Sequence, residues 1–97
     1  MVAGKYLASG VIMGSDMETE IEYIVEGNTL TGTMVVMGTK IEVLEGTVDG
    51  DTFKHQCKVP TPMGQMKIKI DGKVEGDDIS FIIKNPMGKS PFTGKRI

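Results

Sequence analysis

The sequence predicts an all-β protein, an eight-stranded antiparallel up-and-down barrel. The first observation is that a Met-Gly step recurs about every 25 residues along the chain. A fixed internal period indicates one supersecondary unit used repeatedly. The second observation is a Gly-centred turn signal midway between these steps, which makes the unit a β-hairpin. The steps are Met13-Gly14, Met37-Gly38, Met63-Gly64 and Met87-Gly88, and the turn signals are Glu26-Gly27-Asn28, Asp49-Gly50-Asp51 and Glu75-Gly76-Asp77.

Alternation of apolar and polar residues at a period of two predicts the strands between the turns. Apolar positions alternate with glutamates in segment 17–26, and with lysines and an aspartate in segment 65–74. Segments 52–59 and 78–85 alternate in the same way. No stretch has an apolar stripe at helical spacing with capping residues. The expected strands are 4–12, 17–26, 29–37, 40–48, 52–59, 65–74, 78–85 and 90–97.

The first and last strands predict how the sheet closes. Segment 4–12 runs into a Met-Gly step and therefore matches the second half of a repeat, whereas segment 90–97 follows such a step and matches the first half. Together they complete the fourth of four hairpin repeats of about 25 residues. Pairing them closes the sheet and removes both edges. A barrel of this size is filled by side chains or holds one small ligand.

Segment 40–48 conflicts with the simple alternation. Alignment of the repeats places Glu42 and Leu44 inside the barrel, but Ile41 and Val43 are the better core residues. A β-bulge near Val43-Leu44 reconciles the two, with Ile41 and Val43 inward before it and Leu44 inward after it. The bulge decides whether Glu42 faces the lumen or water. We favour the bulge, with the unbulged strand as the alternative.

Size and composition set further limits. Residues 1–97 suffice for one domain with one core. The net charge is −2, and the Lys and Arg residues are spread along the chain, which argues against nucleic acid or an anionic membrane as the main partner. No apolar run is long enough for a membrane span. The single cysteine, Cys57, excludes an internal disulfide and predicts a cytoplasmic protein.

Several phrases resemble those of known barrels. Gly4-Lys5-Tyr6 resembles the Gly-x-Trp opening of calycin-type barrels, the lipocalins and avidins, and 27–33 (GNTLTGT) resembles an avidin-like hairpin. The phrases 46–53 (GTVDGDTF) and 92–96 (FTGKR) resemble small uncharacterised bacterial barrel domains. The resemblance implies a calycin-like fold and lumenal binding of a small molecule. It does not imply biotin binding, because Tyr6 replaces the tryptophan and the chain has no other.

One polar cluster is a candidate for chemistry. Counting back across the Asp49-Gly50 turn places Glu42 opposite Cys57 and Leu44 opposite His55. With Glu42 inward, Glu42, His55 and Cys57 would lie together, where a carboxylate orients an imidazole and an imidazolium lowers a thiol pKa. The alternative, which we favour over catalysis, is a buried histidine satisfied by hydrogen bonds and a cysteine that packs as a small hydrophobe.

Metal and cofactor sites are not predicted. One histidine and one cysteine give no recognisable ligand spacing. Glu18, Glu20 and Glu22 lie on one face of a strand, and we interpret them as a solvated surface. The glycines fit turns or inward positions, where a tightly coiled barrel or room for a ligand explains them.

The remaining inward candidates include an arginine at a barrel end. Arg96 caps the lumen by bonding backbone carbonyls or packing on an aromatic ring, or else binds a carboxylate at the mouth; we favour the cap. Inward methionines fill irregular space or line an adaptable pocket. The candidate ligand-binding residues are Tyr6, Tyr23, Met34, Glu42, His55, Cys57, Met66, Phe81 and Arg96.

The methionines of the four repeated steps form a second candidate surface. Up-and-down connectivity places Met13, Met37, Met63 and Met87 at one barrel end, as a hydrophobic plug or as a rim for an acyl chain, a partner protein or another copy of the chain. We therefore expect a non-enzymatic barrel that binds a small apolar or amphipathic molecule in the lumen or at this Met-rich end. The alternatives are a protein-interaction module of a larger enzyme system and an enzyme that uses His55.

Overall fold

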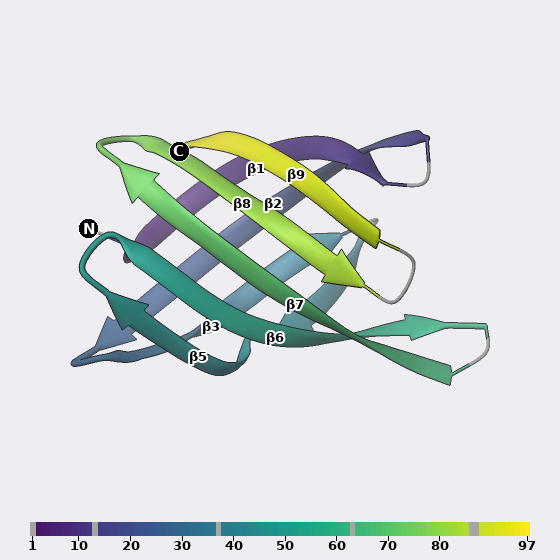
Figure 1. Cartoon of the computed structure of the whole chain (residues 1–97), viewed down its shortest axis with the longest axis horizontal. Helices are drawn as coiled ribbons and strands as arrows, with labels where there is room; N and C mark the ends of the chain where they lie inside the picture. The colour runs from purple at the N-terminus through teal and green to yellow at the C-terminus, as the bar shows by residue number, and fades with distance from the viewer. Residues whose placement is uncertain (1, 13, 37, 63, 86–87) are drawn as a thin grey trace.

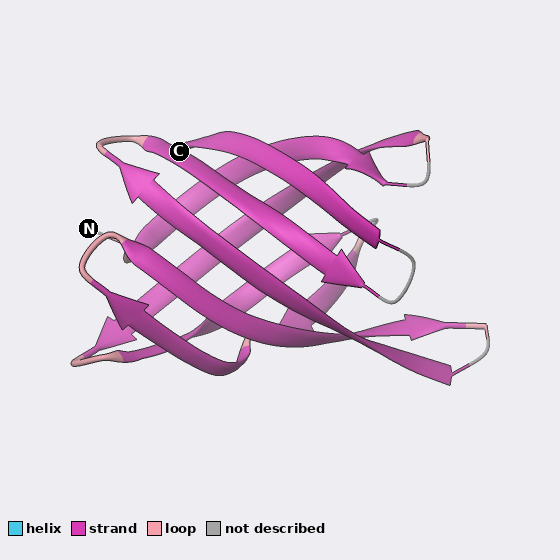
Figure 2. Ribbon diagram, viewed as in Figure 1, coloured by secondary structure: helices cyan, strands magenta, loops and turns pink. Residues whose placement is uncertain are grey.

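A computed structural model describes residues 2–12, 14–36, 38–62, 64–85 and 88–97. All regular elements in these residues are strands, which confirms the predicted all-β class (Figure 2). Accordingly, the described part of the chain contains no helix that could cross a membrane. The strands are β1 (Gly4–Ile12), β2 (Ser15–Glu26), β3 (Thr29–Val36), β4 (Thr39–Glu42), β5 (Leu44–Asp49), β6 (Thr52–Thr61), β7 (Gly64–Glu75), β8 (Asp78–Asn85) and β9 (Gly88–Arg96).

The strands form one closed antiparallel sheet (Figure 1). Each strand pairs with its neighbour in the chain except β4 with β5, which both pair with β3, and β1 pairs with β9 from Tyr6↔Arg96 to Gly10↔Phe92. The predicted closure by the first and last strands is therefore confirmed. Because β4 and β5 are two parts of one strand interrupted at Val43, the nine segments make an eight-stranded barrel. This architecture is consistent with a calycin-like fold.

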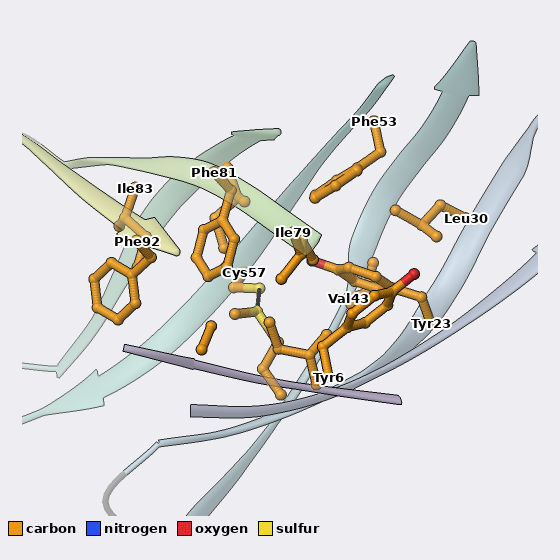
Figure 3. Close-up of a cluster of buried hydrophobic side chains, with 14 of the residues drawn as sticks. Tyr6, Tyr23, Leu30, Val43, Phe53, Cys57, Ile79, Phe81, Ile83 and Phe92 are labelled. Carbon is orange, nitrogen blue, oxygen red and sulfur yellow. Dashed lines mark hydrogen bonds between the residues drawn. The ribbon is translucent and has the colours of Figure 1, made fainter. Parts of the chain in front are cut away.

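Inward side chains from every strand fill most of the barrel (Figure 3). The largest are aromatic. Tyr23 packs against Phe53 at 5.1 Å between ring centroids, and Phe81 stacks on Phe92 at 5.3 Å. All four are almost fully buried. The predicted inward faces are therefore the core, and Thr19 and Ser90 are buried among them.

Inward glycines accommodate the aromatic rings. A Cβ atom on Gly10 would lie 2.6 Å from Cδ1 of Phe92, and one on Gly72 would lie 2.5 Å from Cζ of Phe53. Non-bonded carbon atoms do not approach this closely, so each ring occupies the volume that a side chain at the glycine would fill. Of the two explanations offered by the sequence, close packing applies to these two positions.

The interrupted strand confirms one prediction and corrects another. Ile41 and Val43 are buried and Glu42 is exposed, as a bulge requires. The bulge itself lies slightly later, because β5 pairs with β6 at Leu44↔Gln56 and then at Thr47↔Lys54. Two residues therefore oppose His55, and the first of them, Glu45, has φ = 50°.

The register predicted for this hairpin was wrong. The turn has two residues, Gly50 and Asp51, so that Asp49 pairs with Thr52. This turn alone would place Leu44 opposite Cys57, and the extra residue of the bulge brings it opposite Gln56. Glu42 pairs with Thr33 of β3 and points to solvent, and thus takes no part in a lumenal polar cluster.

One end of the barrel, which we call the capped end, contains the turns at Gly27, Gly50 and Gly76. These glycines have φ between 61° and 63°, as the first central residue of a type II′ hairpin turn requires. Each turn also accepts a backbone hydrogen bond from another strand, in the pairs Val48 N–H to Asn28, Val74 N–H to Asp51 and Arg96 N–H to Asp77. The capped end is therefore held by a ring of backbone contacts as well as by its turns.

Candidate functional site

A cavity of about 230 Å³ lies at the opposite end of the barrel. We call this the Met-Gly end, because the strands on either side of each Met-Gly step meet here, as in Ile12↔Ser15 and Val36↔Thr39. The wall of the cavity is formed by apolar residues that are only partly buried, so the cavity lies where the core meets solvent. These residues are Ile12, Met17, Val36, Val59 and Met66.

The side wall of the cavity contains a seam between two strands. β4 pairs only with β3 among the described strands, and the pairing of β5 with β6 ends at Leu44↔Gln56. Beyond that point no strand pairing joins β4 to the segment of β6 that starts at Cys57. Ile41 and Val59 meet the cavity from either side of this seam. Side-chain packing, not a hydrogen-bond ladder, closes the barrel there.

The chemistry of the cavity is apolar. None of the described residues that line it has an Asp, Glu, Lys, Arg or His side chain. Its polar groups are those of Thr19, Thr39 and Asn85, and its floor contains Met34, Cys57 and Phe92. An ionised group would be costly in such surroundings. The cavity is therefore suited to a neutral or apolar group.

A chain of polar contacts lies beneath the floor. Tyr23 Oη is 2.6 Å from Nε2 of His55, whose Nδ1 is 3.5 Å from Sγ of Cys57. The thiol of Cys57 donates to Sδ of Met34 at 3.8 Å, the contact dashed in Figure 3. We assign the tautomer from the acceptors within reach: the Tyr23 hydroxyl donates to Nε2, and Nδ1 carries the ring proton beside the Gln56 carbonyl. Every proton in the chain then has an acceptor.

The pKa values of the residues in these polar contacts do not favour catalysis. Burial lowers the pKa of His55 from 6.5 to about 4, although its bond to the Gln56 carbonyl opposes the shift. Burial raises the pKa of the Cys57 thiol to about 12, and it also raises the pKa of Tyr23. At neutral pH the imidazole is uncharged and the thiol is protonated, so no activated nucleophile forms.

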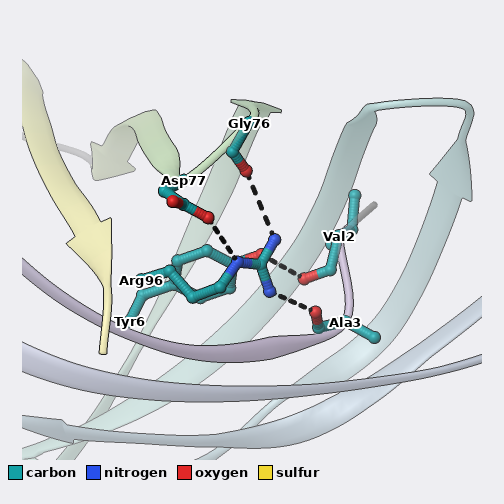
Figure 4. A network of polar contacts seen from close by, with 6 residues as sticks. All are labelled: Val2, Ala3, Tyr6, Gly76, Asp77 and Arg96. Atoms are coloured by element: carbon teal, nitrogen blue, oxygen red, sulfur yellow. Dashed lines mark hydrogen bonds and ion pairs between the residues drawn. The ribbon is translucent and has the colours of Figure 1, made fainter.

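Arg96 closes the capped end (Figure 4). Its Nη1 donates to the carbonyl of Ala3 at 2.7 Å, its Nη2 donates to that of Gly76 at 3.4 Å, and its guanidinium lies 4.9 Å from the ring centroid of Tyr6. The Tyr6 hydroxyl in turn donates to the carbonyl of Val2 at 2.7 Å. Arg96 thus has the geometry of the predicted cap and lies far from the cavity.

The structure separates the predicted ligand-binding residues into groups. Met34, Cys57 and Met66 line the cavity. The others lie in the packed core or at the capped end, except Glu42, which is outside the barrel; they are Tyr6, Tyr23, His55, Phe81 and Arg96. The rim residues Met13, Met37, Met63 and Met87 are outside the described residues.

Two cavity residues, Thr39 and Asn85, were not singled out by the sequence. Each lies within two residues of a Met-Gly step. That proximity was an available signal, because strand ends beside four turns of one barrel end must surround the same opening. Periodicity alone could not show that the opening is hollow.

In comparisons with known proteins, no family model, curated protein or solved structure matches this chain. The fold and the cavity together define its class. It is a closed eight-stranded antiparallel barrel with one packed end and one apolar cavity at the other end.

Proposed function

We propose that this protein is a non-enzymatic, calycin-like carrier of a small apolar or amphipathic molecule, bound in the cavity at the Met-Gly end. The observation that supports the proposal most directly is the apolar lining of that cavity, which contains no charged side chain among the described residues. Apolar cavities of about 150 Å³ stay dry and bind benzene-sized molecules. A cavity of about 230 Å³ is thus large enough for an aromatic ring or a short alkyl segment.

The same volume limits the ligand. Sites for drug-sized molecules typically enclose roughly 300–1,000 Å³, so only part of such a molecule would be enclosed here. Thr39 and Asn85 supply polar atoms beside the opening, whereas the floor at Met34 and Phe92 is apolar. This gradient suits a molecule whose apolar end enters first and whose polar end stays near the turns.

The seam between β4 and β6 supports ligand exchange. Opening it requires Ile41 and Val59 to separate but breaks no strand pairing among the described residues. The proposal also includes a cytoplasmic location and a bacterial origin. The free thiol of Cys57 supports the former, and only the resemblance of the turn phrases supports the latter.

Native mass spectrometry of protein purified gently from a cell extract, followed by displacement of a naphthalene fluorescent probe, tests the proposal. We expect a discrete added mass and saturable probe binding at one site. Val36→Phe fills the cavity and should weaken probe binding at least about tenfold, whereas Ile82→Phe, on the outer face of β8, provides the matched control. Equal probe binding by wild type and Val36→Phe, or no probe binding by wild type, would overturn the proposal.

A further inference from the structure

Lysines that are distant in the sequence lie side by side on the outer face of the barrel. Lys58 pairs directly with Lys67 across β6 and β7, and Lys84 pairs with Lys69 on one side and with Lys89 on the other. We call these five residues the lysine ladder. The sequence suggested that basic residues were spread without clustering; the strand register shows that this was wrong for β6 to β9.

This arrangement is electrostatically unfavourable for the isolated protein. Like charges directly opposite one another destabilise a sheet, and the ladder contains three such pairs. Asp71, on the neighbouring row, forms an ion pair with Lys84 at 2.5 Å and so offsets part of this repulsion, while Lys58 and Lys67 still face each other directly. The outward position beside Lys69 on β6 is Gln56, so no described acidic residue shares the two ladder rows. A partner that brings negative charge would relieve the repulsion.

Acidic residues occupy the opposite side of the barrel. Asp16, Glu18, Glu20 and Glu22 are exposed along β2. In the closed sheet, β2 and β7 are four strands apart in either direction, and Figure 1 shows β7 in front with β2 behind it. The net charge of −2 therefore conceals a basic side and an acidic side.

The ladder lies along one side of the end that contains the cavity. Lys84 precedes Asn85, a cavity residue, while Lys58 and Lys67 adjoin the cavity residues Val59 and Met66. The β6–β7 hairpin that carries them extends beyond the other strands at this end (Figure 1). Positive charge and the apolar opening are thus presented together.

We propose that the lysine ladder docks the protein on an anionic lipid bilayer, with the Met-Gly end turned toward the membrane. The charge is complementary, and a bilayer also offers apolar chains next to its headgroups, matching the cavity beside the ladder. The inference goes beyond the proposed function and holds whether or not the cavity carries a ligand.

Two other occupants fit this surface less well. Non-specific binding of single-stranded nucleic acid uses exposed aromatic side chains for stacking, and the large exposed apolar residues that are described here are all aliphatic. The acidic β2 side of a second copy would match the charge. However, contact between opposite sides of one subunit is heterologous and tends to form open chains, not closed dimers.

Co-sedimentation with vesicles tests the proposal. Binding is expected to phosphatidylcholine mixed with phosphatidylglycerol and not to phosphatidylcholine alone, with release at about 0.5 M salt. Lys67→Gln/Lys69→Gln removes two ladder charges and should weaken binding roughly 25-fold, at about fivefold per lysine. Lys73→Gln/Lys95→Gln makes the same change in net charge nearer the capped end and should weaken it less than about threefold.

The remaining outcomes separate the alternatives. Equal losses in both double variants, or equal binding to both vesicle types, would overturn the docking site. Ultracentrifugation without vesicles that detects assemblies abolished by Lys67→Gln/Lys69→Gln would assign the ladder to a second copy instead. Tighter binding of single-stranded DNA than of anionic vesicles would assign it to nucleic acid.

Vesicle binding without uptake of the naphthalene probe would overturn the proposed function and leave the docking site standing.

Discussion

Tyr23 and His55 form a hydrogen bond across the lumen, with 2.6 Å between the phenol oxygen and Nε2. They come from β2 and β6, which are not neighbours in the sheet, and both are 2% exposed. Their rings also meet edge to face at 5.3 Å. This pair closes the middle of the barrel. It separates the capped end, held by Arg96, from the cavity at the Met-Gly end.

The stability of the protein should fall in acid because of His55. Its pKa is about 4 in the fold and about 6.5 when unfolded, so the unfolded chain binds a proton first as pH falls. The contribution of His55 to the free energy of unfolding is complete above pH 6.5. It is lost progressively as the pH falls to about 4, in total about 3 kcal/mol.

Urea unfolding of wild type and His55→Gln at pH 7 and pH 4 measures this effect. His55 is the only histidine, so the difference between the two proteins isolates its contribution from that of the carboxylates. A pH dependence that is the same in both proteins would contradict the assignment.

Cys57 should resist thiol reagents in the native state. Burial raises its pKa from 9.0 to about 12, so the thiolate population falls about a thousandfold relative to the unfolded chain. Reaction with an aromatic disulfide reagent, followed by absorbance with and without denaturant, should show a comparable difference in rate. Rapid labelling of the native protein would contradict this and would indicate an accessible, ionised thiol.

Replacing Arg96 with lysine should destabilise the capped end by about 1–2 kcal/mol. Lysine keeps the charge but cannot bond the carbonyls of Ala3 and Gly76 while stacking on Tyr6. The ion pair with Asp77 contributes little, because that carboxylate is 83% exposed. Thermal unfolding of Arg96→Lys, with the exposed Lys95→Met as control, measures the effect. Equal stability of the two variants would show that the cap is dispensable.

Glu45→Gly should stabilise the protein by about 0.5–1 kcal/mol, because glycine adopts a left-handed conformation without steric cost. Glu45 has φ = 50° in the bulge, and its side chain is exposed. The same change at Glu18, in the extended part of β2, should destabilise by a similar amount. Chemical denaturation of both variants measures the contrast. Destabilisation of Glu45→Gly would show that its side chain holds the bulge.

The candidate site could be predicted only in part. Met34, Cys57 and Met66 were predicted as inward residues and do line the cavity. Tyr23 and His55 were placed inward by the same alternation. Their hydrogen-bonded side chains, however, fill the lumen where a ligand contact was expected. Alternation reveals which face a side chain occupies, but whether that face is packed or hollow depends on residues from other strands.

Local rules within the sequence determined the strands, their inward faces and the closure of the sheet. Alternation and Gly-centred turns act over a few residues, so they can be recognised in Met66, Ile68 and Ile70 or at Gly27-Asn28 without knowledge of the fold. Tertiary structure decided the rest. A single extra residue at Glu45 changed the register of β5 against β6, and the pairing of β6 with β7 and of β7 with β8 brought Lys58, Lys67 and Lys84 into one charged face. These outcomes depend on long-range register, which no single segment of the chain encodes.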